Sequence, residues 1–474
     1  MAELGIEQNR LDQKFLEVFG ELTIDKKAVR DLKIREARTI TSFVEEWLIS
    51  RFQAKIADKT AVYQAVTDFM SKHLPKKTEK EPIKNRLFNG EAIVLLDNFS
   101  VRIDLAKGLR LVTVPSLEMN DAQVIDEVLN NHDALLGGGQ WGAGRLRLRA
   151  AEKGKNIIEL IEFNPMQSGC VRLDKIVEAR REFTTEEWIY LLIRTMGYEP
   201  TAYTLGQRCN LLLRLLPLVH NNINMMELAP KGTGKSYIYT NLSRYVWLNS
   251  GGALTQAQLF RNQSTKEIGL LGRHDVLVLD EGQSISFKGA DDIHAKFKDY
   301  LESGRYSIGQ HEVPSECGLM ILANIEIFND RPTHEDYVRH LPEMFHDDAL
   351  MDRFHGIIPG WEIPRFTTER AAQGIGIKAD VFGEYAHQLR SVSAFEFCYG
   401  KAHDLDGDIR DVKAVQRLSM ALSKLLMLNP GDADYENYVF EPACKLRERV
   451  RSQLAALNPN EFHPSIKVSR RVPL

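Results

Sequence analysis

Apolar residues recur at helical spacing through the first 72 positions of the chain. Phe15, Phe19 and Leu22 lie three or four positions apart, and later apolar residues repeat the pattern between charged ones. This spacing places apolar side chains on one face of a helix, so we predict a helical region over residues 1–72. Residues 73–86 carry two prolines and many charges, which favours a solvated linker.

Short runs of aliphatic and β-branched residues follow, and turn-forming residues separate them. Three such runs lie within residues 91–114, and a later segment alternates Arg145, Arg147 and Arg149 with apolar residues. Alternation of this kind is typical of strands, and a strand would place the three arginines on one face. We therefore predict a small β-rich module over residues 87–165.

From about residue 205 to residue 365, strand-like apolar runs alternate with helical segments. The runs are Met225–Leu228, Asp275–Leu279 and Leu319–Asn324. Because alternating strands and helices form parallel sheets, we predict an α/β fold for this part of the chain. After it, helical patterns return and continue to residue 474, with polar loops between them.

A glycine-rich loop joins the first of these strands to a segment that can be helical. The sequence Glu227-Leu-Ala-Pro-Lys-Gly-Thr-Gly-Lys-Ser236 follows the pattern G-x-x-x-x-G-K-[ST], except that Ala229 stands at the first position. In such a P-loop, backbone N–H groups hold the phosphates of ATP, Lys235 neutralises the β/γ oxygens and Ser236 ligands Mg²⁺. The predicted nucleotide-binding residues are Lys231, Gly232, Thr233, Gly234, Lys235 and Ser236.

Two adjacent carboxylates end the second strand, at Asp280 and Glu281. Asp280 is placed to hold Mg²⁺ through water, and Glu281 to polarise the water that attacks the γ-phosphate. Any buried strand can end in acidic residues, so the acidic pair indicates an ATPase site only together with the P-loop that precedes it. A glutamate next to the aspartate favours an ATP-hydrolysing machine over a kinase or a GTP switch.

Three further residues are candidates for the same chemistry. Asn324 ends the third strand, where it can orient the lytic water or cap the turn. Arg353 can reach the γ-phosphate of a neighbouring subunit as an arginine finger, or form a surface pair with Asp352. Arg410, near the start of a helix, is a candidate second phosphate sensor, and Arg417 on the same helix is the alternative.

Composition sets limits on the partners. The 474 residues, 43% hydrophobic and 27% charged, fit a globular protein of about three domains. The net charge of −4 does not indicate a nucleic-acid or membrane partner, so such a site must be a local patch. The five scattered cysteines, and the absence of a long apolar run or a signal pattern, predict a cytoplasmic protein with no membrane contact. No spacing predicts a metal other than Mg²⁺.

The order of these motifs resembles the AAA+ ATPase module of the Lon clade, and more closely the BrxL family of BREX anti-phage defence systems. The segments that carry the resemblance are 181–200, 212–236, 272–281 and 298–309, with weaker similarity through the N-terminal third. It implies an AAA+ P-loop core over 170–365 and a C-terminal helical lid over 366–474. It also assigns Walker A to Lys235 and Ser236, Walker B to Asp280 and Glu281, sensor 1 to Asn324, the arginine finger to Arg353 and sensor 2 to Arg410.

The resemblance implies partners as well. An arginine finger implies a homo-oligomeric ring, a hexamer or stacked hexamers, and members of the family assemble on double-stranded DNA. Other BREX components are further candidate partners. Residues 300–309 match a helix that leads into a hairpin facing a central pore. The implied phosphate contacts, for which a solvated charged face is the alternative, are Arg145, Arg147, Arg149, Lys153 and Arg305.

Two other functions stay open. Lon-type proteins end in a Ser–Lys peptidase domain, but 64 residues follow Arg410 here and contain no glycine-flanked serine, so we expect no protease activity. The first alternative is a polypeptide unfoldase. Unfoldases usually present an aromatic pore residue and DNA translocases a basic one, and Arg305 and Tyr306 are adjacent. The second alternative is a nucleotide-gated scaffold in which hydrolysis is slow.

Overall fold

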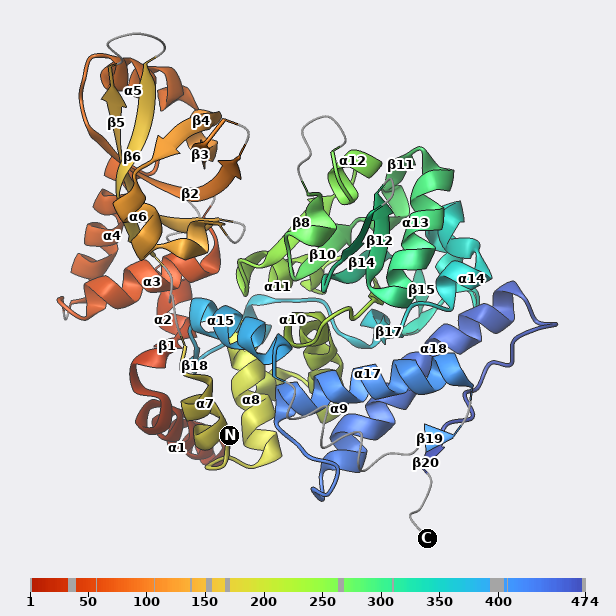
Figure 1. The fold of residues 1–474 in the computed structure, drawn as a ribbon. Helices are drawn as coiled ribbons and strands as arrows, with labels where there is room; N and C mark the ends of the chain where they lie inside the picture. The colour runs from red at the N-terminus through yellow and green to blue at the C-terminus, as the bar shows by residue number, and fades with distance from the viewer. Residues whose placement is uncertain are drawn as a thin grey trace. The chain divides into compact units, whose positions relative to one another are not determined.

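The computed structural model describes residues 2–32, 40–56, 58–105, 107–136, 139–150, 156–166, 171–262, 268–308, 311–392, 405–406 and 408–470 (Figure 1). The chain divides into two compact units. The sheet unit comprises residues 1–23, 172–377 and 385–474, and the barrel unit comprises residues 24–171 and 378–384. The helices expected over residues 1–72 are thus divided between the two units, with the division close to residue 23.

In the barrel unit, helices precede a set of five strands. The helices are α2 (Lys26–Asp31), α3 (Ser42–Gln53), α4 (Lys59–His73) and α5 (Lys80–Phe88), and α6 (Asp126–Asn131) follows the third strand. The linker expected over residues 73–86 is wrong, because α5 begins within it. Its apolar residues Ile83 and Leu87 are buried in the core of the barrel, which explains why this charged segment is helical.

The five strands close into a barrel. They are β2 (Ile93–Asp104), β3 (Leu109–Val114), β4 (Met119–Val124), β5 (Gln140–Arg149) and β6 (Ile157–Pro165). The order around the barrel is β2-β3-β4-β6-β5, in which β4 and β6 are parallel and the other pairs antiparallel. A five-stranded closed barrel with this order is the arrangement of an OB-fold.

Two aromatic rings in the core of the barrel face glycines. The rings of Phe99 and Phe163 lie 5.7 Å apart, edge to face. A Cβ atom on Gly144 would lie 2.4 Å from the Phe99 ring, and one on Gly142 would lie 2.5 Å from the Phe163 ring. Glycine at these two positions of β5 therefore makes room for the rings.

The sheet unit is built on five parallel strands, which confirms the α/β fold expected for this region. They are β7 (Met225–Ala229), β8 (Val246–Ser250), β10 (Val276–Asp280), β14 (Gly318–Asn324) and β17 (Gly356–Pro359), in the order β17-β7-β14-β10-β8. On one face, alternate strand residues such as Leu277 and Ile321 share a core with Phe297 of α13 (Ala290–Ser303) and Leu454 of α18 (Glu441–Leu457).

Shorter elements complete the sheet unit and its connections. Within the described part of the chain, the remaining α-helices are α1 (Ala2–Phe19), α7 (Leu173–Arg180), α8 (Thr185–Thr195), α9 (Leu205–Leu212), α10 (Leu216–Val219), α11 (Lys235–Asn241), α12 (Gln256–Leu259), α14 (Asp348–Met351), α15 (Ala379–Arg390) and α17 (Ile409–Leu426). Short strands form the pairs β9 (Ala253–Thr255) with β11 (Ser286–Lys288), β12 (Arg305–Ile308) with β13 (His311–Pro314), β15 (Ile327–Phe328) with β16 (Arg331–Pro332), and β19 (Leu405–Asp406) with β20 (Ser469–Arg470); β1 is Thr23–Asp25 and β18 is Ile375–Ile377. No helix among the described residues has the length and apolar character required to cross a bilayer.

Replacing Gly144 by alanine should destabilise the barrel, because the added methyl group would overlap the Phe99 ring and the side chain of Leu160. Overpacking of this kind costs about 1–3 kcal/mol. Urea-induced unfolding measures the change in the free energy of unfolding. The matched control is Ala143→Val on the same strand, where the side chain is half-exposed and the change should stay within about 0.5 kcal/mol. Equal effects of the two variants would contradict the packing described for Gly144.

Candidate functional site

Three strands bring the predicted nucleotide residues to one edge of the sheet. Strand β14 lies between β7 and β10, and Asn324 at its end is opposite Ala229, the last residue of β7. The P-loop leaves from the end of β7, and Asp280 ends β10 on the other side. Because all three strands are parallel, their carboxyl ends meet at the same edge. The predicted P-loop, acidic pair and asparagine are thus neighbours in the fold.

A direct contact joins the P-loop lysine to the asparagine. The Lys235 ammonium donates a hydrogen bond of 2.6 Å to Oδ1 of Asn324, and Lys235 is buried. Burial lowers the pKa of Lys235, and the carboxylates of Glu227 and Asp280 oppose that shift. An anionic ligand at this position would favour the charged lysine, so the site suits phosphate oxygens.

The P-loop needs glycine at two positions. Gly232 and Gly234 have φ angles of +86° and +77°, in the left-handed region that favours glycine. Gly234 also lies against the hydroxyl of Tyr198, which would be 2.5 Å from a Cβ atom there. The Tyr198 hydroxyl donates a hydrogen bond of 3.2 Å to the Gly234 carbonyl. Helix α11 begins directly afterwards at Lys235, so the loop and the helix start are fixed together.

A fully buried ion pair lies beneath the loop. Arg214 donates two hydrogen bonds to the carboxylate of Glu227, at 2.9 Å and 2.6 Å, and both side chains are 0% exposed. The same guanidinium donates to the hydroxyl of Tyr198 at 2.9 Å and to the carbonyl of Thr233 in the P-loop at 3.3 Å. Although burial opposes the charge, Glu227 raises the pKa of Arg214. The pair connects strand β7, Tyr198 and the loop.

The acidic pair ends β10 with an unusual backbone. Glu281 has a φ of +51°, a left-handed conformation that is uncommon for a residue other than glycine. Its N–H donates to Oδ1 of Asp280 at 2.9 Å, and its carbonyl accepts from the N–H and the hydroxyl of Ser284 at 2.8 Å and 2.9 Å. These hydrogen bonds hold the turn, and the Glu281 side chain is exposed. Strain of this kind persists where surrounding contacts fix it.

These residues fit a nucleotide with Mg²⁺. Within the described residues, no group of three or more His, Cys, Asp or Glu side chains gathers as a metal site. Mg²⁺ normally takes one or two protein ligands together with phosphates and water. The hydroxyl of Ser236 and the carboxylate of Asp280 would supply that small set.

The two predicted arginines lie at the opposite edge of the sheet. Strand β17 is parallel to β7, and Gly356 is opposite Met225 at the start of β7. Arg353 precedes β17, so it lies at the amino ends of the strands. The Arg410 guanidinium donates to Oδ2 of Asp352 at 2.6 Å, which places it at the same edge. The five residues of β7 span roughly 16 Å, so Arg353 and Arg410 lie about one strand length from the P-loop of their own chain.

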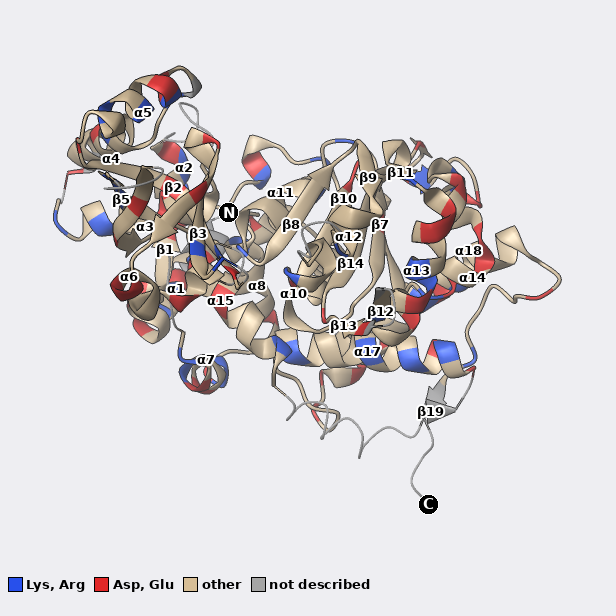
Figure 2. Cartoon of the chain, turned by 45° about the horizontal axis from the view of Figure 1, so that its top comes forward, with Lys and Arg blue, Asp and Glu red and all other residues tan. Residues whose placement is uncertain are grey.

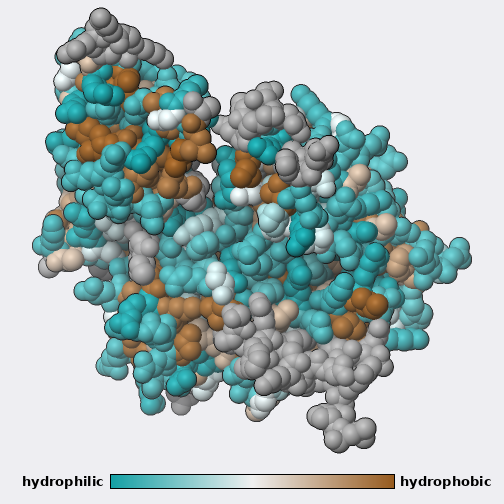
Figure 3. Space-filling view, in the orientation of Figure 1, coloured by the Kyte–Doolittle hydropathy of each residue, from teal (hydrophilic) through white to brown (hydrophobic). Residues whose placement is uncertain are grey.

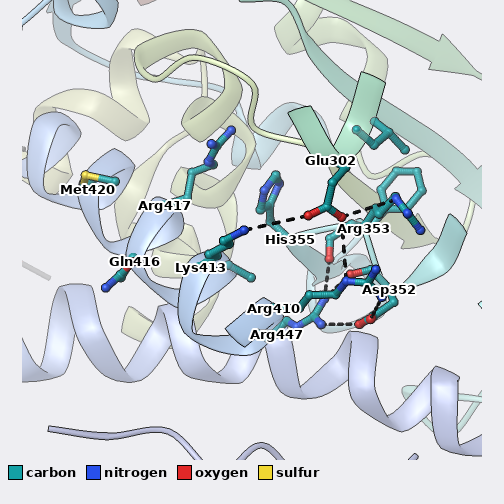
Figure 4. A pocket seen from close by; sticks show the side chains of 13 residues that line it. Glu302, Asp352, Arg353, His355, Arg410, Lys413, Gln416, Arg417, Met420 and Arg447 are labelled. Carbon is teal, nitrogen blue, oxygen red and sulfur yellow. Dashed lines mark hydrogen bonds and ion pairs between the residues drawn. The ribbon is translucent and has the colours of Figure 1, made fainter. Parts of the chain in front are cut away.

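Arg353 and Arg410 line one cavity of about 250 Å³ (Figure 4). Helix α17 contributes Lys413 and Arg417 as well, and basic residues recur along this helix (Figure 2). The acidic residues of the cavity are Glu302 and Asp352. Burial lowers the pKa of the lining His355, whose Nδ1 accepts the N–H of Asn224 at 3.0 Å, so the arginines and the lysine supply the positive charge.

The predicted DNA contacts have carboxylate partners. In the barrel unit, Arg145 lies 3.4 Å from Glu162, and Arg147 and Arg149 lie 3.2 Å and 2.8 Å from Glu159. In the sheet unit, Arg305 pairs with Glu312 across the β12–β13 hairpin at 3.1 Å. Lys153 lies outside the described residues. Each described arginine stays partly exposed, so a phosphate would have to compete with a carboxylate.

Sequence reasoning missed three residues of these sites. Tyr198, Arg214 and Glu302 were not predicted, and Glu227 was noted only as part of the P-loop segment. A charged residue inside an apolar strand indicates a buried ion pair, because a buried carboxylate needs a cation. The position of Glu227 in β7 therefore indicates a buried partner, although it does not identify Arg214.

Comparisons with known proteins agree across the chain. Residues 158–467 match the family model of the Lon-like protease BrxL-like ATPase domain, and residues 17–148 match that of the BREX system Lon protease-like protein BrxL N-terminal domain. A protein of Bacillus cereus named Lon-like protease BrxL is 32% identical over 441 residues, which is 91% of this chain and 65% of the relative. A protein of the same name from Escherichia coli is 30% identical over 470 residues, which is 97% of this chain and 67% of the relative. The chain thus spans about two thirds of the length of these relatives.

Replacing Arg214 by methionine should destabilise the sheet unit by about 3–5 kcal/mol, because it leaves the Glu227 carboxylate buried without a cation. It should also weaken binding of a fluorescent ATP analogue, since the guanidinium contacts Thr233 and Tyr198. The double variant Arg214→Met with Glu227→Leu should regain much of the lost stability. Urea-induced unfolding compares the wild type with Arg214→Met, Glu227→Leu and the double variant, which together form a double-mutant cycle. Losses that simply add would contradict the account of a coupled buried pair.

Proposed function

The chain belongs to the BrxL family, and on this premise we propose that it is an AAA+ P-loop ATPase that works as a ring on double-stranded DNA. The observation that carries the proposal is the edge of the sheet at which Lys235 contacts Asn324, with Asp280 ending the neighbouring strand β10. An ATPase domain is the function given by the family match, and the remaining steps are inferred from the geometry.

Each residue of this edge has one task in the proposed reaction. The P-loop N–H groups and Lys235 bind the phosphates, and Ser236 and Asp280 hold Mg²⁺. Mg²⁺, when bound, neutralises charge that develops on the phosphate oxygens. Phosphate replaces Asn324 as the partner of Lys235, which leaves the Asn324 amide able to orient water. Glu281 accepts the hydrogen bond of the attacking water.

The second half of the site would come from another copy of the chain. Arg353 and Arg410 lie at the far edge of their own sheet, where they line the cationic cavity with Lys413. Arginines that cannot reach the nucleotide of their own chain are available to that of a neighbour. Such a head-to-tail contact, repeated with a rotation that closes, forms a ring, and the C-terminal helices α17 and α18 would form the lid on which the neighbour docks.

DNA is the polymer that the hairpin favours. Among the described side chains of the β12–β13 hairpin, that of Arg305 is 58% exposed, whereas Tyr306 is 1% exposed and packs against Phe260. A buried tyrosine is not available to grip a polypeptide, and an exposed arginine can contact phosphates. The barrel unit adds an OB-like fold, a common scaffold for nucleic acids.

Besides its exposed arginines, the barrel unit has exposed apolar side chains that could contact a partner. Apolar side chains gather over the barrel on the face in view (Figure 3). In this unit Ile103, near the end of β2, is 51% exposed, and Leu105, directly after β2, is 89% exposed.

By analogy with the names of its relatives, we place the chain in BREX-type anti-phage defence together with other BREX components. The tail residues Ser465 and Lys467 are both exposed, so these two residues form no enclosed Ser–Lys site.

The proposal predicts DNA-stimulated ATP turnover by a particle of ring size. Lys235→Ala should abolish nucleotide binding, and Glu281→Gln should keep binding but lower turnover by about 100-fold or more, because it removes the base. The matched control is Glu326→Gln, an exposed residue after β14 at the same edge. The measurements are phosphate release with and without duplex DNA, and light scattering after size exclusion.

Two results would move the proposal to its alternatives. Turnover that ignores DNA but rises with an unfolded polypeptide would favour the unfoldase. Undiminished protection of cells against phage by the Glu281→Gln variant would favour the nucleotide-gated scaffold. Normal turnover by Lys235→Ala would contradict the assignment of the P-loop itself.

A further inference from the structure

A carboxylate of the chain itself occupies the cationic cavity. Glu302, in the last turn of α13, lies 3.5 Å from Nε of Arg353, 3.7 Å from Nε of Arg410 and 3.9 Å from Nζ of Lys413. Figure 4 shows its side chain directed toward these three cations, of which Arg353 lies between α14 and β17, and Arg410 and Lys413 lie on α17. One carboxylate thus lies beside Lys413 and beside both arginines that the proposed function assigns to the nucleotide of a neighbour.

Two properties of the Glu302 carboxylate would allow another anion to replace it in the cavity. The Glu302 side chain is 38% exposed, and its three contacts are longer than hydrogen bonds. By contrast, Asp352 is 4% exposed, accepts a 2.6 Å hydrogen bond from Arg410 and is also held by Arg447. Asp352 therefore keeps the Arg410 guanidinium in place when Glu302 leaves.

Glu302 also lies at an unfavourable end of its helix. The carbonyl end of a helix carries partial negative charge, so a carboxylate there needs cations nearby. The last turn of α13 contains no basic residue of its own. The stability of the C-terminal end of α13 thus depends on Arg353, Arg410 and Lys413. It changes when these cations pair with an anion other than Glu302.

The end of α13 is joined directly to the hairpin that the proposed function places on DNA. Gly304, two residues after Glu302, ends the helix with a φ of +70°, and β12 begins at Arg305. The rings of Tyr300 and Tyr306 are 6.1 Å apart, and Lys296 donates to the Ser307 carbonyl at 3.2 Å. Helix and hairpin are therefore tied to each other along their length.

We propose that Glu302 is a positioning residue that competes, inside the cavity, with the terminal phosphate of a nucleotide held by a second copy of the chain. When that phosphate takes Arg353 and Arg410, Glu302 is released and the end of α13 moves with the β12–β13 hairpin. The inference rests on the proposed function, because it needs Arg353 to act on the neighbour. By linkage, a change that releases Glu302 also strengthens nucleotide binding.

The variant that tests this is Glu302→Gln, with Asp299→Asn as its matched control. Asp299 is an exposed acid of the same last turns of α13, so both variants remove one negative charge near the helix end. Hydrogen exchange of the segment 300–316 in the assembled protein, with and without Mg²⁺ and a non-hydrolysable ATP analogue, reports on the hairpin without DNA.

In the wild type and in Asp299→Asn, the analogue should increase exchange in this segment. In Glu302→Gln, exchange without nucleotide should already match that of the nucleotide-bound wild type, and the KM for ATP should fall by about tenfold, within the usual range of coupling between sites. If Glu302→Gln does not fold, Glu302→Asp serves instead, because the shorter side chain keeps the charge but not the reach.

The results distinguish a failure of the role of Glu302 from a failure of the proposed function. Exchange and KM in Glu302→Gln that equal those of Asp299→Asn, or a wild-type hairpin indifferent to the analogue, would overturn the role of Glu302 while leaving ATP turnover explained. Full turnover in Arg353→Ala would instead overturn the proposed function on which the inference rests.

Discussion

The buried pair of Arg214 and Glu227 is the constraint on which the nucleotide site depends. Glu227 lies in the middle of β7, where a carboxylate without a partner would be very costly, and Arg214 pairs with it through two hydrogen bonds. The remaining N–H groups of the guanidinium reach Thr233 and Tyr198, and Tyr198 in turn contacts Gly234. The loop that would hold phosphates is thus connected, through the carbonyls of Thr233 and Gly234, to the buried ion pair beneath it.

The parallel sheet separates the chemistry into two halves. Lys235, Asp280 and Asn324 lie at the carboxyl ends of the strands, and Arg353 and Arg410 lie at the amino ends. A strand is too long for one side chain to bridge. Because of the distance between the two edges of the sheet, more than any single contact, we propose that a second copy of the chain completes each site. In such an arrangement, nucleotide bound at one edge of a chain can influence helix α13 of the neighbour.

The positions of the local motifs could be predicted from the sequence because they depend on the chain order. The P-loop, the acidic pair and Asn324 are recognisable from strand ends and glycines, and the structure places them together. The prediction of a solvated linker over residues 73–86 was wrong. The apolar side chains of α5 are buried against barrel residues distant in the sequence, which no local pattern reveals. The Arg214–Glu227 pair and the contacts of Glu302 join residues 13 to more than 100 positions apart, so they appear only in the fold. For the same reason the sequence identified Arg410 as a candidate sensor without showing that it lies beside Arg353.

Mixing two inactive variants tests the shared site most directly. A chain with Arg353→Ala keeps Glu281, and a chain with Glu281→Gln keeps Arg353, so some interfaces in a mixed ring are intact. With random mixing in equal amounts, turnover should return to about one quarter of the wild-type value, since one interface in four combines both intact residues. Mixing Glu281→Gln with Lys235→Ala, which damage the same half of the site, is the control and should restore none. Turnover in the first mixture that stays at the level of either variant alone would contradict the account.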